Sequence, residues 1–209
     1  MISMSHLAMF AATSVVLAFT PGPDIIYVMT RGMAQGRKAA LAAAAGFALG
    51  NFGHTFFAII GLSALIASSA VAFTCIKLAG AAYLMYLGIK MLRSRNPLLP
   101  QGRSADLECR IIFRQSILAN LMNPKVAVFF LAFFPQFLER DRGGVALQML
   151  VLGTTFVLVT MVCFGTVAIM SGEIGRWLNS RSGSGDRIGQ LAGCVLIGLG
   201  LRLAWPERL

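Results

Sequence analysis

The chain has 209 residues, of which 57% are hydrophobic and only 12% are charged. This balance lies far outside the range of soluble globular domains, so water is not the main solvent of this protein. The formal net charge of +10 would suggest a nucleic-acid partner in a soluble protein, and here it has to be explained by where the basic residues lie.

Apolar stretches long enough to cross about 30 Å of hydrocarbon recur along the chain. Too little chain remains outside them for a soluble catalytic domain, so we expect a single all-α polytopic membrane domain over residues 1–209. The first stretch follows no Lys or Arg and is too long for a signal peptide, so we expect it to be retained. The six predicted transmembrane helices are approximately 7–30, 39–66, 70–92, 111–134, 145–170 and 188–204.

The first predicted span is interrupted by Pro21, Gly22 and Pro23, and Asp24 follows directly. Proline lacks a backbone N–H and clashes with the preceding turn, so the break should free main-chain carbonyl groups. Inside a membrane, irregular backbone is tolerated where it is buried in protein or lines a watery cavity. The helix that restarts at Pro23 presents a partly positive end, which the carboxylate of Asp24 suits.

The second predicted span carries Gly46, Gly50 and Gly53 on one face, with Asn51 and His54 close by. Glycines at this spacing let another backbone come close, so helix packing is the simpler interpretation. A narrow passage beside a substrate is the alternative. His54 could carry a proton in a cavity, or it could be a hydrogen-bonded packing residue.

A linker rich in Pro, Gly and charge, at about 94–110, leaves three predicted spans on each side. An odd number of crossings forces a duplicated second half to insert upside down. We therefore expect two inverted three-helix repeats, at about 5–93 and 111–205, each with a broken first helix.

The fourth predicted span repeats the break, with Asn123 and Pro124 followed by Lys125. A cation is disfavoured at the positive end of a helix, and an intramembrane charge already costs roughly 2.5–3.5 kcal/mol on insertion scales. We therefore expect Lys125 to face an anion, either Asp24 in the empty state or a solute carboxylate. The alternatives are two structural kinks, or an ion pair that only locks helices together. The amides expected to contact freed carbonyls or substrate are Asn51, Asn120 and Asn123.

The basic residues are divided unequally between the two sides of the predicted membrane domain, which explains the net charge as a topology signal and makes nucleic acid an unlikely partner. By the positive-inside rule the rich side is cytoplasmic, and both termini are then extracytoplasmic. In the last span, Gly189 and Gly193 could pack within the subunit or against a second copy, so a homodimer is one interpretation. The twelve residues of the rich side are Arg31, Arg37, Lys38, Lys90, Arg93, Arg95, Arg103, Arg110, Arg114, Arg176, Arg181 and Arg187; the poor side has Arg140, Arg142, Arg202 and Arg208.

The four cysteines form no CxxC pair, so we expect no disulfide framework, metal site or cofactor. A membrane thiol oxidoreductase would have to use Cys75 with Cys163. A small-ion exporter would need more ligands in the spans than Asp24 and His54 supply.

Four segments together resemble the lysine exporter and homoserine/threonine exporter family of bacterial amino-acid efflux proteins. They are FTPGPD at 19–24, RGMAQGRKAALAAAAGFALGN at 31–51, GAAYLMYLGIKMLR at 80–93 and NPKVAVFFLAFFPQF at 123–137. The resemblance implies efflux of amino acids or their derivatives across the bacterial inner membrane, driven by the proton-motive force. It does not name the substrate. We expect alternating access around Asp24 and Lys125, not an enzyme.

Overall fold

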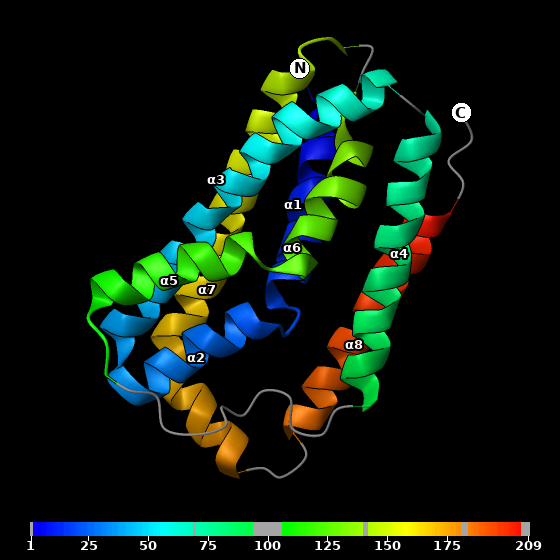
Figure 1. Ribbon diagram of the computed structural model, residues 1–209. Helices are drawn as coiled ribbons and strands as arrows, with labels where there is room; N and C mark the ends of the chain where they lie inside the picture. Colours follow the sequence, from blue (N-terminus) through cyan, green and yellow to red (C-terminus); the bar gives the residue numbers. More distant parts are fainter. Residues whose placement is uncertain (1, 69, 94–105, 140–141, 181–183, 206–209) are drawn as a thin grey trace.

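The computed structural model describes residues 2–68, 70–93, 106–139, 142–180 and 184–205, and these residues form a helical bundle (Figure 1). The first half comprises α1 (Met4–Phe19), α2 (Pro23–Gln35), α3 (Arg37–Ser68) and α4 (Ala70–Arg93). The second half comprises α5 (Cys109–Leu121), α6 (Pro124–Val128), a π-helical turn (Phe129–Phe133), a 3₁₀ turn (Phe134–Phe137), α7 (Val145–Ser180) and α8 (Ser184–Ala204).

Length and composition support part of the predicted membrane topology. Segments of α3, α4 and α7 are each long and apolar enough to cross a membrane alone, and two bent pairs pass the same test when each pair is counted as one span. The pairs are α1 with α2 and α5 with the helical segment Pro124–Phe137. The apolar part of α8 among the described residues, Gly189–Ala204, is shorter than these spans. Up to five spans are therefore supported, and the sixth stays a prediction.

The two bends arise where the sequence predicts them. α1 ends at Phe19, since Thr20 precedes a proline and takes an extended backbone with ψ 116°. α2 starts at Pro23 and is bent by 58° from α1. The second break lies between α5 and α6, where Asn123 caps the new helix by accepting a hydrogen bond from the N–H of Lys125, and the bend is 46°.

Glycines set the closest approaches between helices. A Cβ on Gly50 would lie 2.8 Å from Cβ of Asn120, and Gly46 and Gly53 abut Phe113 and Leu121 in the same way, so one face of α3 packs tightly on α5. The other long interfaces join α3 to α7 and α4 to α8. At the α4–α8 interface, a Cβ on Gly193 would lie 2.7 Å from the carbonyl oxygen of Gly88, so Gly193 packs within the subunit.

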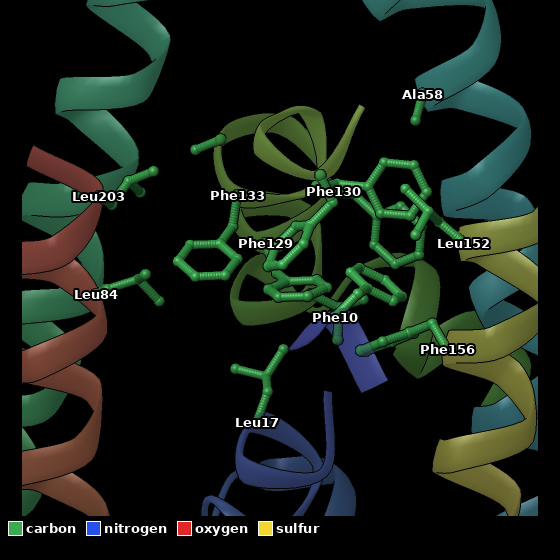
Figure 2. Close-up of a cluster of buried hydrophobic side chains, with 14 of the residues drawn as sticks. Phe10, Leu17, Ala58, Leu84, Phe129, Phe130, Phe133, Leu152, Phe156 and Leu203 are labelled. Atoms are coloured by element: carbon green, nitrogen blue, oxygen red, sulfur yellow. The ribbon is translucent and has the colours of Figure 1, made fainter. Parts of the chain in front are cut away.

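An aromatic cluster fills the half of the bundle where α1 begins and α8 ends (Figures 1 and 2). The sequence leaves open whether its phenylalanines meet lipid or neighbouring helices; the structure buries them against α1 and α7. Phe10 of α1 lies 5.6 Å from Phe134 and 5.1 Å from Phe137, measured between ring centroids. Phe129 stacks on Phe156 of α7 at 5.0 Å.

Candidate functional site: a buried ion pair between two helix breaks

The two breaks bring one acid and one base together in the interior. Lys125 Nζ lies 3.1 Å from Asp24 Oδ2 and 3.2 Å from Asp24 Oδ1. Asp24 is 3% exposed and Lys125 is 4% exposed. An ion pair this deeply buried loses most of its hydration, so each charge depends on its partner, and removing one partner alone is strongly destabilising.

The first break supplies a further ligand for the ammonium group. The carbonyl oxygen of Thr20, which the break frees from the helix, accepts a hydrogen bond from Lys125 Nζ at 3.2 Å. The ammonium group therefore donates one hydrogen bond to Thr20 and one to Asp24 Oδ1, and it also lies beside the second carboxylate oxygen. Gly22 leaves the space that this arrangement needs, because a Cβ there would lie 2.6 Å from Asp24 Oδ1 and 2.9 Å from Lys125 Nζ.

A ladder of amides runs beside the ion pair and connects α5, α3 and α7. Asn120 Nδ2 donates to Asn51 Oδ1 at 3.1 Å, and Asn51 Nδ2 donates to Thr160 Oγ1 at 3.2 Å. All three side chains are buried. Asn120 Oδ1 and Asn123 Nδ2, which lie in this part of the structure, are buried and have no partner among the described residues. Buried polar atoms of this kind are costly unless a water or ligand completes them.

A small cavity lies between the ion pair and the amide ladder. It leaves only about 10 Å³ of room for the centre of a water molecule, which is space for about one water. An amino acid cannot enter a site of this size, so this conformation is closed and binding requires the walls to separate. The lining residues are Leu17, Ala18, Asp24, Asn51, Asn120, Lys125, Val126, Phe156, Thr160 and Phe164.

His54 lies apart from the ion pair. Its Nε2 is 3.0 Å from the carbonyl oxygen of Asn120, and its ring stacks on Phe130 with centroids 5.4 Å apart. Since a carbonyl only accepts, Nε2 carries the proton in this contact. His54 is buried but does not line the cavity. This geometry matches the packing interpretation more closely than the proton-carrier one.

Several residues of the site could not be assigned to it from sequence patterns. Thr20 acts through its main-chain carbonyl, and the side chains of Thr160, Phe156 and Phe164 come from α7, far along the chain. The position of Thr20 just before Pro21 is the one usable clue, because its carbonyl lies at the break. Phe156 and Thr160 lie one turn apart on α7, and only the packing of α7 on α3 makes them part of the site.

The described residues hold no group of three or more His, Cys, Asp or Glu side chains that could bind a metal ion. The four cysteines are free thiols: Cys163 is buried, and Cys75, Cys109 and Cys194 are exposed. The ion pair and the amide ladder bind by charge and hydrogen bonds, and the site has the chemistry of a binding site for a small polar molecule.

Comparison with known proteins agrees with this description. Residues 15–206 match the family model described as LysE type translocator. The chain belongs to this family. A LysE type translocator is a membrane transporter and not an enzyme. This confirms the family resemblance seen in the sequence and the expectation of a transporter rather than an enzyme.

Relatives of this translocator cover nearly its whole length. An uncharacterized membrane protein of Vibrio cholerae is 38% identical over 93% of this chain and 94% of its own. A homoserine/homoserine lactone efflux protein of Salmonella typhimurium is 34% identical over 81% of this chain and 82% of its own. A leucine efflux protein of Salmonella choleraesuis is 28% identical over 91% of each chain. No solved structure matches the translocator.

Proposed function

We propose that this translocator exports amino acids or amino-acid derivatives from the bacterial cytoplasm by secondary active transport. The observation that carries the proposal is the buried Asp24–Lys125 ion pair, which joins two broken helices beside a small polar cavity. The names of the Salmonella relatives, which export homoserine, homoserine lactone and leucine, support the substrate class.

A zwitterion can replace each half of this ion pair. The substrate ammonium takes the place of the Lys125 side chain beside Asp24, and the substrate carboxylate takes the place of Asp24 beside Lys125. The amide ladder supplies further hydrogen bonds through the unpaired Asn120 Oδ1 and Asn123 Nδ2. Because both charges stay paired while the substrate is bound, the exchange avoids the cost of leaving one buried charge alone at that step.

Alternating access follows from two inverted repeats, 5–93 and 111–205, that rock around the ion pair. The order of elements supports the repeats: each half begins with a bent pair, which is followed by a long helix and a second helix. Equivalent helices also pack on each other, α3 on α7 and α4 on α8, as a two-fold pseudo-axis through the site would require. The proposed cytoplasmic linker at 94–110 falls largely outside the described residues.

Protons drive the cycle in this proposal. A proton that enters from the outside and binds the Asp24 carboxylate releases the substrate ammonium. The same proton leaves toward the cytoplasm when Lys125 pairs again with Asp24, and one proton then moves inward for each substrate exported. The geometry of His54 gives it no part in this path.

Orientation can be tested without transport. We propose that both termini are extracytoplasmic, since most basic residues lie toward the opposite end. A reporter that is active only outside the cytoplasm, fused after Leu209, should be active. A reporter fused within the linker at 94–110 should be inactive, and the reverse pattern would contradict the inverted six-span topology.

The decisive experiment measures transport in inside-out membrane vesicles with labelled leucine and homoserine, alongside metabolite profiles of medium from cells with and without the gene. We expect Asp24→Asn and Lys125→Met to insert normally and to lose accumulation. The matched control is Glu173→Gln, which removes an exposed ion pair with Arg37 (3.5 Å) and should transport normally. Normal export by both ion-pair variants would remove these charges from the mechanism.

A further inference from the structure

A second, larger pocket opens at the outer end of the bundle, between α1, the 3₁₀ turn and α8. Its volume is about 470 Å³, which lies within the range typical of small-molecule sites. In the proposed orientation this end faces the outside. The pocket is lined by His6, Met9, Gln136, Phe137, Leu201, Arg202 and Trp205.

The pocket contains a cation that no described carboxylate neutralises. The guanidinium of Arg202 contacts Met9 Sδ at 3.5 Å and lies over the ring of Phe133 at 6.0 Å, so it rests against a thioether and an aromatic face. The nearest described acid, Glu139, pairs instead with His6 and Arg142. An arginine offers a planar fork of donors that matches a carboxylate.

Gln136 adds a second donor to the same pocket. Its Nε2 is buried and has no acceptor among the described residues, although the residue lines the pocket wall. An anion with two oxygen atoms could accept hydrogen bonds from both this amide and the arginine that lines the same pocket. Met9, Phe137 and Leu201 supply apolar surface next to these donors for a side chain.

The aromatic cluster lies between this pocket and the central cavity. Phe156 lines the cavity, Phe137 lines the outer pocket, and Phe10 lies 6.4 Å from the first and 5.1 Å from the second (Figure 2). The π-helical turn Phe129–Phe133 contributes Phe129, which stacks on Phe156. π-helical turns are rare and frequently lie at functional sites.

We propose that the outer pocket is an exit site that binds the carboxylate of the exported amino acid through Arg202 and Gln136, after the substrate has passed the rings of Phe10 and Phe156. The inference rests on the proposed function for the identity of the ligand. An anionic phospholipid headgroup presents similar chemistry to Arg202, and the test below separates the two sources.

Trp205 lines the pocket and reports its occupancy, because the chain has only one other tryptophan, Trp177. In a Trp177→Phe background, full-length protein in nanodiscs of zwitterionic lipid is titrated with leucine and with homoserine while the fluorescence of Trp205 is recorded. Leucinol, which lacks the carboxylate, is the ligand control. We expect at least one amino acid to change the emission saturably, and leucinol to have at least ten-fold weaker affinity than leucine.

Arg202→Gln should weaken the amino-acid titration at least ten-fold, whereas Arg176→Gln, an exposed arginine at the opposite end, should leave it unchanged. An Arg202→Gln titration identical to the parent would overturn the proposal. Equal binding of leucine and leucinol would also overturn it. So would a change in Trp205 emission when anionic phospholipid is included in the nanodiscs, with no response to either amino acid.

Failure of this inference and failure of the proposed function give different results. If vesicles export amino acid but Trp205 does not respond to leucine or homoserine, the exit site is wrong and the transport function stands. If Trp205 responds through Arg202 while no export occurs, the pocket binds amino acid and the proposed export function is wrong.

Discussion

The two helix breaks meet at one ion pair, but they are built differently. At the first break, Gly22 precedes α2 without any side-chain cap, and the acid Asp24 lies at a helix end whose dipole favours it. At the second break, Asn123 caps the new helix with its side chain, and the base Lys125 lies at a helix end whose dipole opposes it.

This difference indicates which break depends on the other for its stability. Asp24 keeps a favourable helix end even if its partner is lost, while Lys125 has no compensation in its own segment. The second break therefore depends on the first for its charge, for the carbonyl of Thr20 and for the space left by Gly22. Single substitutions at the two breaks should therefore differ in how strongly they destabilise the protein.

Asp24→Asn should be the most damaging single change. It leaves the Lys125 ammonium buried and unpaired, which typically destabilises a protein by about 3–5 kcal/mol. Lys125→Met should destabilise by about 1–2 kcal/mol less, because the α2 dipole still stabilises the Asp24 carboxylate. Unfolding of both variants in detergent by chemical denaturation measures the difference. Equal losses, or a larger loss for Lys125→Met, would refute the asymmetry.

Gly22→Ala should separate the two charges without removing either. The backbone of Gly22 is extended, with φ −152°, so an alanine fits the backbone and any effect comes from its Cβ. We expect about 1–3 kcal/mol of destabilisation from overpacking and at least a ten-fold loss of vesicle transport. Gly165→Ala is the matched control, because nothing lies within 4 Å of a Cβ there. Normal transport by Gly22→Ala would show that the pair tolerates displacement.

Asn123→Ala tests the cap that only the second break has. Losing the bond from Lys125 N–H to Asn123 Oδ1 should destabilise the protein by about 0.5–2 kcal/mol. Asn123→Ser keeps a capping oxygen and should restore most of the loss. Thermal unfolding in detergent compares the two variants. If the serine is no better than the alanine, the amide acts through its unpaired nitrogen instead.

The start of α1 also meets the end of the second broken segment, at Glu139, and there we expect stability to depend on pH. The Ser3 hydroxyl, with help from Arg142 and His6, holds the pKa of Glu139 below its ordinary value of 4.5. A lowered folded-state pKa means that this stabilisation is complete above pH 4.5 and is lost as the pH falls through the lower folded-state value.

Glu139→Gln should remove this small pH dependence, which melting temperatures recorded between pH 3 and pH 6 would show. Because the partner Arg142 is 58% exposed and solvent screens this ion pair, the effect should be the smallest of the four. Glu173→Gln is again the control, and it should keep the slope of the parent. An unchanged slope for Glu139→Gln would mean that other carboxylates control acid stability.

Much of the fold follows from the sequence because its signals are local. Hydropathy predicts the membrane helices, and Pro21, Pro23 and Pro124 predict both bends, since proline acts on its own turn of helix. The glycine face of the second predicted span indicates close packing, and the structure identifies α5 as its neighbour. The prediction of a sixth span is not confirmed, because the described apolar part of α8, Gly189–Ala204, is shorter than the other candidate spans.

From the sequence alone we could predict apolar helices that can cross a membrane, the two positions where helices break, and one acid and one base directly after the breaks. Only the tertiary structure decided which atoms meet: the carbonyl of Thr20 with Lys125, Thr160 with Asn51, and His54 with Phe130 rather than with the ion pair. The physical reason is distance along the chain. A break depends on residues within one turn, whereas a buried charge is satisfied by whichever helix packs against it.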